Sequence, residues 1–305
     1  MKFVKWASAE NTYRTKEISK WLDIYPELAN TQYILTEKLH GSNFQIAIDT
    51  FGNVNVGSRK NWLDINGSFQ GAKIAEILND FSKVIETFSQ YATEYNTEVR
   101  LFGELFGNEI QKGVDYGKEK KLLLFGIMLD GRLMEQQYLI DAIPTNKRVP
   151  IIAICNSLEE AINYDTKFNS TIIDADNNIC EGVVISPLLQ VYEHNGSVFL
   201  LKKKNDEFSE KVHAPKDTAI DTEAYALNAE FKSYITGNRI ESVFSKYGQI
   251  QSTSEIGKYI KLVLDDAMEE FMKDFGDEFS TMNKTQQKTV TNIGSMLANL
   301  LKNYL

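Results

Sequence analysis

The stretch Thr36-Glu37-Lys38-Leu39-His40-Gly41-Ser42-Asn43-Phe44 lies between two apolar runs. Tyr33-Ile34-Leu35 precedes it, and apolar residues alternate with more polar ones over positions 44–48. Alternation of this kind predicts a half-buried strand. The stretch therefore predicts two strands joined by a turn, with Lys38 close to the junction and Gly41 allowing a close backbone approach. Taken alone, the pattern fits an ordinary hairpin end as well as a catalytic site.

The composition is that of a globular protein. Of the 305 residues, 43% are hydrophobic and 25% are charged, which is enough chain for one large domain or two. Cys155 and Cys180 are too few for a disulfide framework or a zinc site. The sequence has no apolar run of about 18 residues, the length that a membrane span needs, and we see no signal peptide. We therefore expect a cytoplasmic protein without a membrane segment.

The net charge of −9 argues weakly against nucleic-acid binding, because neutralising phosphates requires lysine and arginine. Net charge averages the whole surface, however, and a local basic groove can bind on an acidic protein. Lysines cluster at residues 118–121, 202–204 and 211–216. Clusters of this kind are most often solvated faces, so a nucleic-acid partner has to be argued from other residues.

Three further candidate residues lie on the strands that follow. Arg59 ends a strand that returns from a turn at residues 51–53, so it is expected to lie near Lys38. Glu104 sits between bulky apolar residues, where a carboxylate is costly unless it is paired, so we expect it to face a polar site. Phe125 lies inside a continuous apolar strand, where a core side chain is the ordinary interpretation. The apolar spacing over residues 69–91 predicts one amphipathic helix.

The last predicted strands carry an acid and three lysines. Glu181 opens one apolar strand, and Lys202-Lys203-Lys204 ends the next. In an alternating strand, Lys202 and Lys204 share one face while Lys203 points away. From about residue 222 the spacing predicts helices. We therefore expect an α+β chain of two domains, an antiparallel-sheet domain at residues 1–221 and a small all-α domain at residues 222–305.

Taken in order, these motifs resemble those of the lysine-nucleotidyltransferase superfamily of ligases and capping enzymes, and most closely the RNA ligase 2 family. The stretch around Lys38 looks like the family's nucleophile motif, with His40 where DNA ligases have aspartate. Phe125 stands where the family has a base-stacking aromatic residue. The family's later motifs are matched in this sequence by residues 57–59, 102–107 together with 110–116, 181–185 and 202–211. The resemblance is densest from residue 30 to about 211, and it implies an ATP-grasp-like ligase fold for the first domain.

The resemblance implies an ATP-dependent RNA ligase. Such an enzyme joins RNA 3′-hydroxyl and 5′-phosphate ends through lysyl-AMP and RNA-adenylate intermediates, here with nicked duplex RNA as the expected partner. Lys38 is the implied nucleophile, since covalent catalysis divides one hard step into two easier ones. The neutral amine is the reactive form of a lysine, and neighbouring cations favour it. Lys202 and Lys204 are expected to supply that charge and to neutralise the phosphates.

The remaining site residues take their expected roles from the resemblance. Glu181 is placed near Lys38 or near a divalent metal, Mg²⁺ or Mn²⁺, which prefers carboxylate and phosphate oxygens. The other roles are a phosphate contact for Arg59, a ribose contact for Glu104, adenine stacking for Phe125, nucleotide or phosphate contacts for Glu37 and His40, and a part in the later steps for Asn43.

Two other classes of protein compete with this interpretation. A DNA ligase or a capping-type nucleotidyltransferase would carry a β-barrel oligonucleotide-binding domain after the last lysine motif, where this sequence predicts helices. A catalytically inactive RNA-binding scaffold would not need the complete set of reactive residues that is present. We expect an active enzyme that works as a monomer.

Overall fold

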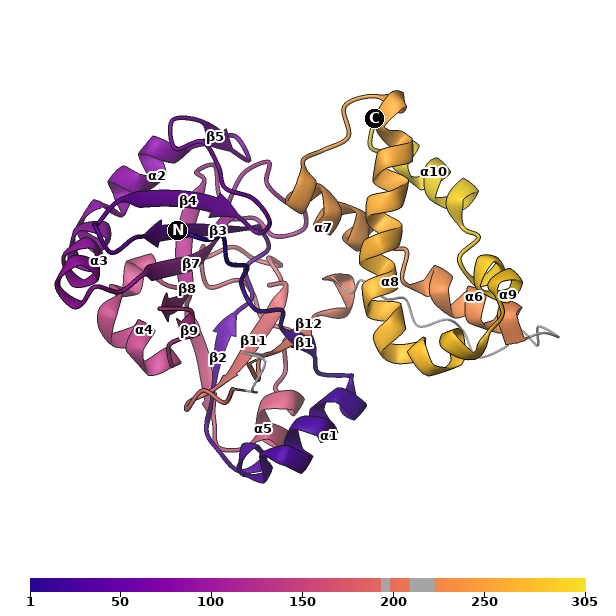
Figure 1. Ribbon diagram of the computed structural model, residues 1–305, viewed down its shortest axis with the longest axis horizontal. Helices are drawn as coiled ribbons and strands as arrows, with labels where there is room; N and C mark the ends of the chain where they lie inside the picture. Colours follow the sequence, from indigo (N-terminus) through magenta and orange to yellow (C-terminus); the bar gives the residue numbers. More distant parts are fainter. Residues whose placement is uncertain (193–197, 209–222) are drawn as a thin grey trace. The chain divides into compact units, whose positions relative to one another are not determined.

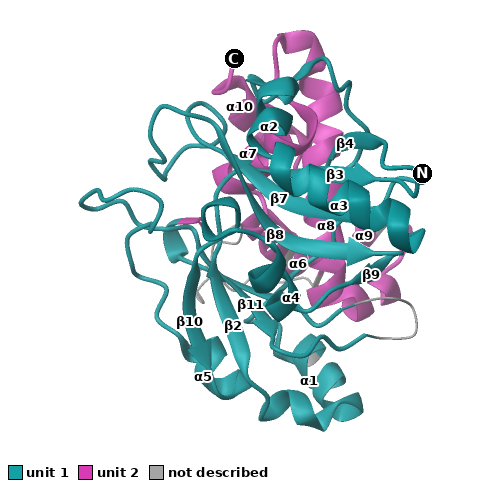
Figure 2. Cartoon of the chain, turned by 90° about the vertical axis from the view of Figure 1, so that its left-hand side faces the viewer, with its two compact units in different colours: residues 1–207 teal, residues 208–305 magenta. Residues whose placement is uncertain are grey.

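The chain forms two compact units in a computed structural model that describes residues 1–192, 198–208 and 223–305 (Figures 1 and 2). The units comprise Met1–Glu207 and Phe208–Leu305. The described residues of the first unit form two five-stranded sheets, here called sheet A and sheet B, and a two-stranded ribbon. The predicted boundary at residues 221/222 and the end of the last predicted motif, residues 209–211, fall outside the described residues.

Sheet A has the strand order β1-β12-β11-β2-β10. All its pairs are antiparallel except β1 with β12, which is parallel. One face packs on a core of apolar side chains that includes Tyr33, Leu35, Val183, Ile185 and Leu201. Helices α1 and α5 and the turn η1 contribute to the same core. The bounds are β1 Glu10–Asn11, α1 Thr15–Ile24, η1 Pro26–Ala29, β2 Tyr33–Glu37, β10 Ile151–Cys155, α5 Leu158–Asn163, β11 Gly182–Pro187 and β12 Leu201–Lys204.

Sheet B has the strand order β4-β3-β7-β8-β9, and all its pairs are antiparallel. Helices α2, α3 and α4 cover one face and share its core (Figure 1). The opposite face carries the polar residues of β3 and β7. The bounds are β3 Ser42–Ile48, β4 Val54–Ser58, α2 Ile74–Asp80, α3 Ser82–Tyr95, β7 Val99–Phe106, β8 Lys121–Leu129, β9 Arg132–Leu133, α4 Gln136–Ala142 and η2 Thr145–Lys147.

The prediction of a single helix over residues 69–91 is wrong in two places. Residues 68–73 form the ribbon β5 Ser68–Phe69 with β6 Ala72–Lys73, because Gln70 and Gly71 turn the chain through positive φ angles. The helical part is then divided at Phe81, between α2 and α3. The apolar spacing was nevertheless that of the core face, since Ile74, Ile77, Phe81, Val84 and Phe88 are all buried there.

The stretch around Lys38 joins the two sheets. Its first strand, β2, belongs to sheet A, and its second strand, β3, belongs to sheet B. The two predicted strands are therefore present, but they do not form a hairpin with each other. Gly41 makes the crossing possible, because a Cβ atom at this position would lie 2.3 Å from the Leu105 carbonyl oxygen of β7. The crossing places Lys38 where the two sheets meet.

The second unit is helical throughout its described residues, as the sequence predicted. Its bounds are η3 Asp206–Phe208, which spans the division between the units, α6 Glu223–Ser233, α7 Gly237–Tyr247, η4 Thr253–Glu255, α8 Ile256–Thr281, α9 Lys284–Val290 and α10 Gly294–Lys302. The long helix α8 bends at Phe275, whose backbone is not helical. The apolar faces of these helices enclose one core of their own, in which Phe231, Phe244, Val263 and Phe271 are buried.

A membrane-spanning helix is absent from the described ranges, since none of their helices is both long and apolar enough.

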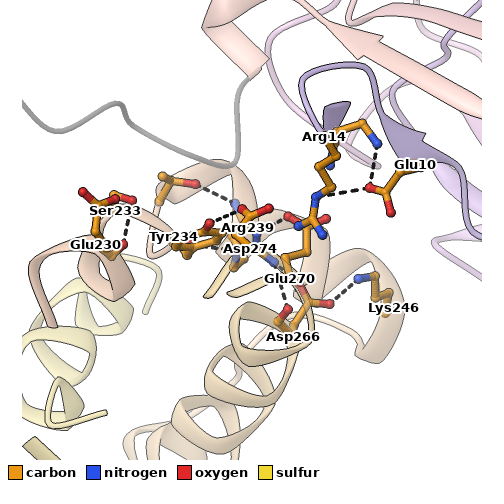
Figure 3. Close-up of polar contacts among 12 residues, drawn as sticks. Glu10, Arg14, Glu230, Ser233, Tyr234, Arg239, Lys246, Asp266, Glu270 and Asp274 are labelled. Atoms are coloured by element: carbon orange, nitrogen blue, oxygen red, sulfur yellow. Dashed lines mark hydrogen bonds and ion pairs between the residues drawn. The ribbon is translucent and has the colours of Figure 1, made fainter. Parts of the chain in front are cut away.

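A buried arginine joins α7 to α8 and to the residue that follows α6 (Figure 3). Arg239 of α7 has a relative exposure of 1%, and its guanidinium donates to Asp266 Oδ2 at 2.6 Å and to Glu270 Oε2 at 2.9 Å, both on α8. Its Nε also donates to the Tyr234 carbonyl, at 2.7 Å. Lys246 is a further partner of Asp266 but remains partly exposed. Because a buried charge is costly without partners, this network holds α7 on α8.

We expect Arg239→Ala to lower the free energy of unfolding of the helical unit by about 3–5 kcal/mol, since it leaves two carboxylates without their buried partner. Chemical denaturation of the full chain, followed by circular dichroism at 222 nm, measures the change. Lys246→Ala is the matched control, and it should cost at most about 1 kcal/mol because its charge is better solvated. Equal losses for the two variants would contradict the role given to Arg239.

Candidate active site

One carboxylate gathers three basic side chains where the sheets meet. Glu181 Oε2 accepts a hydrogen bond from Lys38 Nζ at 2.6 Å, and His40 Nδ1 lies 3.3 Å from the same oxygen. The other oxygen, Oε1, pairs with Lys204 Nζ at 3.0 Å. Lys38 and His40 come from the crossing, Glu181 directly precedes β11, and Lys204 ends β12. Four of the predicted site residues, far apart in sequence, therefore form one group.

The charges of this group are mutually dependent. Burial alone would raise the pKa of Glu181, but Lys204, Lys38 and His40 together hold it well below its usual value. The carboxylate is therefore charged at neutral pH and balances the lysines. The backbone fixes its place: Lys38 N donates to Gly182 O at 2.9 Å, and Asn205 N donates to Glu181 O at 2.9 Å. Gly182 has φ +145°, and a Cβ atom there would lie 2.0 Å from the Lys203 carbonyl oxygen, so only glycine fits.

A second polar group lies on sheet B. Asn43 Nδ2 donates to Glu104 Oε2 at 2.7 Å, and Arg59 Nη1 donates to Asn43 Oδ1 at 3.0 Å. Asn43 and Glu104 are opposite each other in the β3–β7 register, while Arg59 directly follows β4. The alternation of β3 and β7 sends Phe44 and Leu105 into the core and these polar side chains to the other face. The predicted polar surroundings of Glu104 are confirmed.

The Glu104 carboxyl holds its proton unusually well. Burial raises its pKa to about 7, against the opposing effects of Lys38, Asn43 and Arg59. Lys38 lowers this pKa and Glu181 raises it, so the two polar groups influence each other electrostatically. Near neutral pH the Glu104 carboxyl can therefore either donate or accept a hydrogen bond, which suits contact with a hydroxyl group.

Strand register separates the three consecutive lysines. Lys202 and Lys204 have Val184 and Gly182 as their partners on β11, and alternation places them on the face of sheet A opposite the core residue Leu201. Lys203 lies on the other face, where its Nζ donates to the carbonyls of Ile162 at 2.9 Å and Tyr164 at 2.8 Å. These carbonyls lie at the end of α5, so Lys203 caps that helix. The prediction that Lys203 and Lys204 lie on opposite faces of the strand is confirmed.

Glu37 lies apart from the other predicted site residues. On β2 it follows the alternation of Tyr33 and Leu35, which face the core of sheet A. Its carboxylate is 1% exposed and accepts hydrogen bonds from Ser170 Oγ at 2.6 Å, Thr171 N at 2.9 Å and Thr171 Oγ1 at 2.6 Å. These donors anchor the loop before β11. A side-chain contact between Glu37 and a nucleotide stays a prediction, and the geometry favours a structural role.

A β-bulge sets the place of Phe125. In the β7–β8 pair, Phe102 is opposite Gly126 and Gly103 is opposite Leu124, so Phe125 is the extra residue without a partner. A bulge turns the side chain of its extra residue out of the regular alternation. Phe125 is accordingly only half-buried, and its carbonyl accepts a hydrogen bond from Gln136 Nε2 at 3.2 Å. The ordinary interpretation of a core phenylalanine does not hold here.

The structure adds three contacts that sequence reasoning missed. The Tyr116 hydroxyl accepts a hydrogen bond from His40 N at 2.8 Å and so holds the backbone of the crossing. Ser8 Oγ lies 3.0 Å from Arg59 Nη2, and the Trp6 ring lies 4.8 Å from the Phe125 ring, centroid to centroid. Tyr116 ends the motif at residues 110–116, so the sequence held a signal for it. Nothing in the local pattern marks Ser8 or Trp6, because both meet the site only through the fold.

The described ranges hold no group of three or more His, Cys, Asp or Glu side chains arranged for a metal ion. The available donor is the single carboxylate of Glu181, next to lysines that can bind phosphate. Mg²⁺ is commonly held by one or two carboxylates together with substrate phosphates and water. The residues therefore fit a metal that arrives with a phosphorylated ligand, and they do not fit a preformed metal cage.

We expect Glu104→Gln to remove a pH-dependent loss in the free energy of unfolding. The folded-state pKa of Glu104, about 7, lies above the ordinary value of 4.5, so ionising it costs stability as pH rises from 4.5 through 7. The variant should be more stable than the parent by about 3 kcal/mol at pH 8 and show little difference at pH 4.5. Urea denaturation across this range measures the effect. Glu86→Gln, an exposed substitution on α3, is the control, and a pH-independent difference for Glu104→Gln would contradict the prediction.

Family models match both parts of the chain. The RNA ligase model matches residues 31–204, and the model of the T4 RNA ligase 2 C-terminal region matches residues 218–297. The first match covers more than half of the chain and contains every predicted site residue.

Solved structures of Naegleria gruberi RNA ligase are similar in part. A lysine-to-alanine mutant with ATP and Mn shares 17% identity over 68% of this chain and 58% of that one, with a TM-score of 0.49. A glutamate-to-alanine mutant with AMP and Mn shares 19% over 68% and 57%, with a TM-score of 0.49, and the form with PPi shares 16% over 68% and 58%, with a TM-score of 0.47. This chain thus spans less than two thirds of the length of these structures.

The assignment rests on the two family models and on the order of the motifs. The chain belongs to the RNA ligase family, and within it to the RNA ligase 2 group, whose C-terminal region it shares.

Proposed function

We propose that this protein is an ATP-dependent RNA ligase that joins a 3′-hydroxyl end to a 5′-phosphate end through lysyl-AMP and RNA-adenylate. Family membership supports the reaction class. The observation that carries the proposal is the Glu181 carboxylate, which holds together Lys38 and Lys204, whose side chains are 22% and 13% exposed. A lysine beside a second cation is suited to react with a phosphate, because one amine can attack the phosphorus while the other cation neutralises the phosphate charge.

In the first step the Lys38 nitrogen attacks the α-phosphorus of ATP. A phosphorus–nitrogen bond forms, the bond to the β-phosphate oxygen breaks, and pyrophosphate leaves. Lys38 must first lose a proton, and Glu181 Oε2, at 2.6 Å, is within reach to accept it. Because the pKa of Glu181 is held well below its usual value, this carboxylate is a weak base. Its main task is to orient Lys38 rather than to retain the proton.

The cations around Lys38 stabilise the phosphates. Lys204, 3.0 Å from Glu181, and Lys202 on the same strand face supply positive charge to the leaving pyrophosphate. Arg59 adds a contact from sheet B. Mg²⁺ or Mn²⁺, when bound at Glu181 and the phosphates, supplies further positive charge for the same purpose. The Naegleria structures with ATP or AMP and Mn are consistent with these cofactors.

The nucleoside would extend over sheet B. Glu104 can exchange a hydrogen bond with a ribose hydroxyl, since its carboxyl is partly protonated near neutral pH. Phe125 offers its half-buried ring to adenine. In the second step a 5′-phosphate oxygen of RNA attacks the lysyl-AMP phosphorus and releases Lys38. In the third, the 3′-hydroxyl attacks the adenylylated 5′-phosphate and AMP leaves, with Asn43 and His40 placed to contact the phosphates.

Three finer points belong to the same proposal. We take the substrate to be nicked duplex RNA, the working form to be a monomer and the compartment to be the cytoplasm. The helical unit would serve the later steps by holding RNA, because joining requires the 3′-hydroxyl to lie in line with the activated phosphate. The rates at which nicked RNA duplexes, nicked DNA duplexes and single strands are sealed distinguish an RNA ligase of this type from a DNA ligase.

We predict that Lys38→Ala abolishes covalent labelling by α-³²P-ATP in Mg²⁺, because it removes the attacking nitrogen. The same variant should still seal RNA that already carries a 5′-adenylate, which bypasses the first step. Chelation of the metal should abolish labelling of the parent protein. Lys20→Ala, at an exposed lysine of α1, is the control and should label normally. Normal labelling of Lys38→Ala, or no labelling of the parent in any condition, would reject the proposed function.

Substitutions of the three lysines of β12 should have different effects according to the face of the strand on which each lysine lies. We expect Lys202→Ala and Lys204→Ala each to slow lysyl-AMP formation by about 10²–10³-fold, because each loses one preorganised phosphate contact. Lys203→Ala should keep the rate within a few-fold and instead lower the free energy of unfolding by about 1–3 kcal/mol, since it uncaps α5. Single-turnover labelling and urea denaturation provide the two measurements. Lys203→Ala as the slowest of the three would contradict the assignment of faces.

A further inference from the structure

We propose that Trp6 is a positioning residue of the nucleotide site, one that holds Phe125 in place for the base. The inference rests on the proposed function, because it assigns the base to Phe125. It concerns the segment at residues 2–8, which forms neither helix nor strand. None of the motifs found in the sequence includes this segment.

The segment runs across the face of sheet B that carries the polar site residues. Arg100 Nη2 donates to the Lys2 carbonyl at 2.5 Å, and Gln45 Nε2 donates to the Val4 carbonyl at 3.1 Å. Both donors are buried, and both alternate with core residues on their strands, so they mark the face opposite the helices. The segment is therefore fixed by buried side chains and has a defined place on the sheet.

Trp6 is seated in a notch made by Gly126. A Cβ atom on Gly126 would lie 2.3 Å from the Trp6 ring, so the indole fills the space that any other residue would take. The ring centroid lies 5.1 Å from that of Phe102 and 4.8 Å from that of Phe125, with interplanar angles of 50° and 59°. Both distances lie in the range of favourable aromatic pairs.

This seat matters because Phe125 is the extra residue of the bulge. It has no partner across the β7–β8 pair, so the regular sheet does not fix its side chain. Trp6 supplies a contact from the side, and Gln136 fixes the backbone carbonyl. Two residues beyond Trp6, Ser8 meets Arg59 at 3.0 Å. One short segment thus touches both the proposed base contact and the proposed phosphate contact.

Fluorescence tests whether Trp6 adjoins the bound base. Trp6, Trp21 and Trp62 are the only tryptophans, so the double substitution Trp21→Phe with Trp62→Phe leaves Trp6 as the sole indole. Titration of this variant with ATP should change the Trp6 emission in proportion to nucleotide bound. An unchanged emission in a variant that still labels with ATP would overturn the inference and leave the proposed function standing. Failure of the parent protein to bind or label with ATP would reject the proposed function itself.

Kinetics test the positioning role. Trp6→Ala should raise the KM for ATP in lysyl-AMP formation about tenfold while changing kcat by less than about threefold, since it disturbs binding rather than attack. Gly126→Ala should have the same effect with Trp6 intact, because it displaces the ring from its seat. Trp6→Phe should restore most of the affinity.

The matched control is Trp21→Ala, which also removes an indole packed on aromatic rings but on sheet A, against Phe199 and Tyr25. It should change the KM for ATP by less than about twofold. Circular dichroism establishes that each variant is folded before its kinetics are compared. Equal KM changes for Trp6→Ala and Trp21→Ala, or a normal KM for both Trp6→Ala and Gly126→Ala, would overturn the inference.

Discussion

The rest of the candidate site depends on the contacts of the Glu181 carboxylate with Lys38, His40 and Lys204. This carboxylate is buried, and a buried charge persists only with partners, so the fold has to bring Lys38, His40 and Lys204 to it. The backbone bonds of Lys38 to Gly182 and of Asn205 to Glu181 keep these segments in register. Two glycines make that closeness possible, since Gly41 and Gly182 each face a carbonyl oxygen where a side chain would collide.

Strand alternation decides which side chains face the candidate site and which face the core. On β12 it sends Leu201 to the core and Lys203 to the end of α5, and leaves Lys204 for Glu181. The same rule on β2 directs Glu37 away from the site and into the bonds with Ser170 and Thr171. Glu37, although next to Lys38 in sequence, thus hydrogen-bonds to a distant loop. Neighbours along a strand are separated by the thickness of the sheet, so sequence proximity is a poor guide to the members of such a site.

Sheet B contributes through a departure from this regularity. The bulge on β8 frees Phe125 from the core pattern, and Gly126 leaves the space into which Trp6 fits. The candidate site therefore combines an ion-paired group at the crossing with an aromatic residue that packs against a segment outside the sheet. In the helical unit, by contrast, a buried ion network around Arg239 serves the packing of α7 on α8.

The sequence by itself determined the strands around Lys38, the helical second part, and the order of motifs that identifies the family. These features are local, since alternation, helical spacing and short motifs are readable from neighbouring residues. It also determined the faces of Lys203 and Lys204, because a strand has only two. Only the tertiary structure decided that β2 and β3 enter different sheets, that Phe125 sits in a bulge, that Glu37 bonds to a distant loop and that Trp6 packs against Phe125. Each of these depends on contacts between residues far apart in the chain, and periodicity within one segment carries no information about such partners.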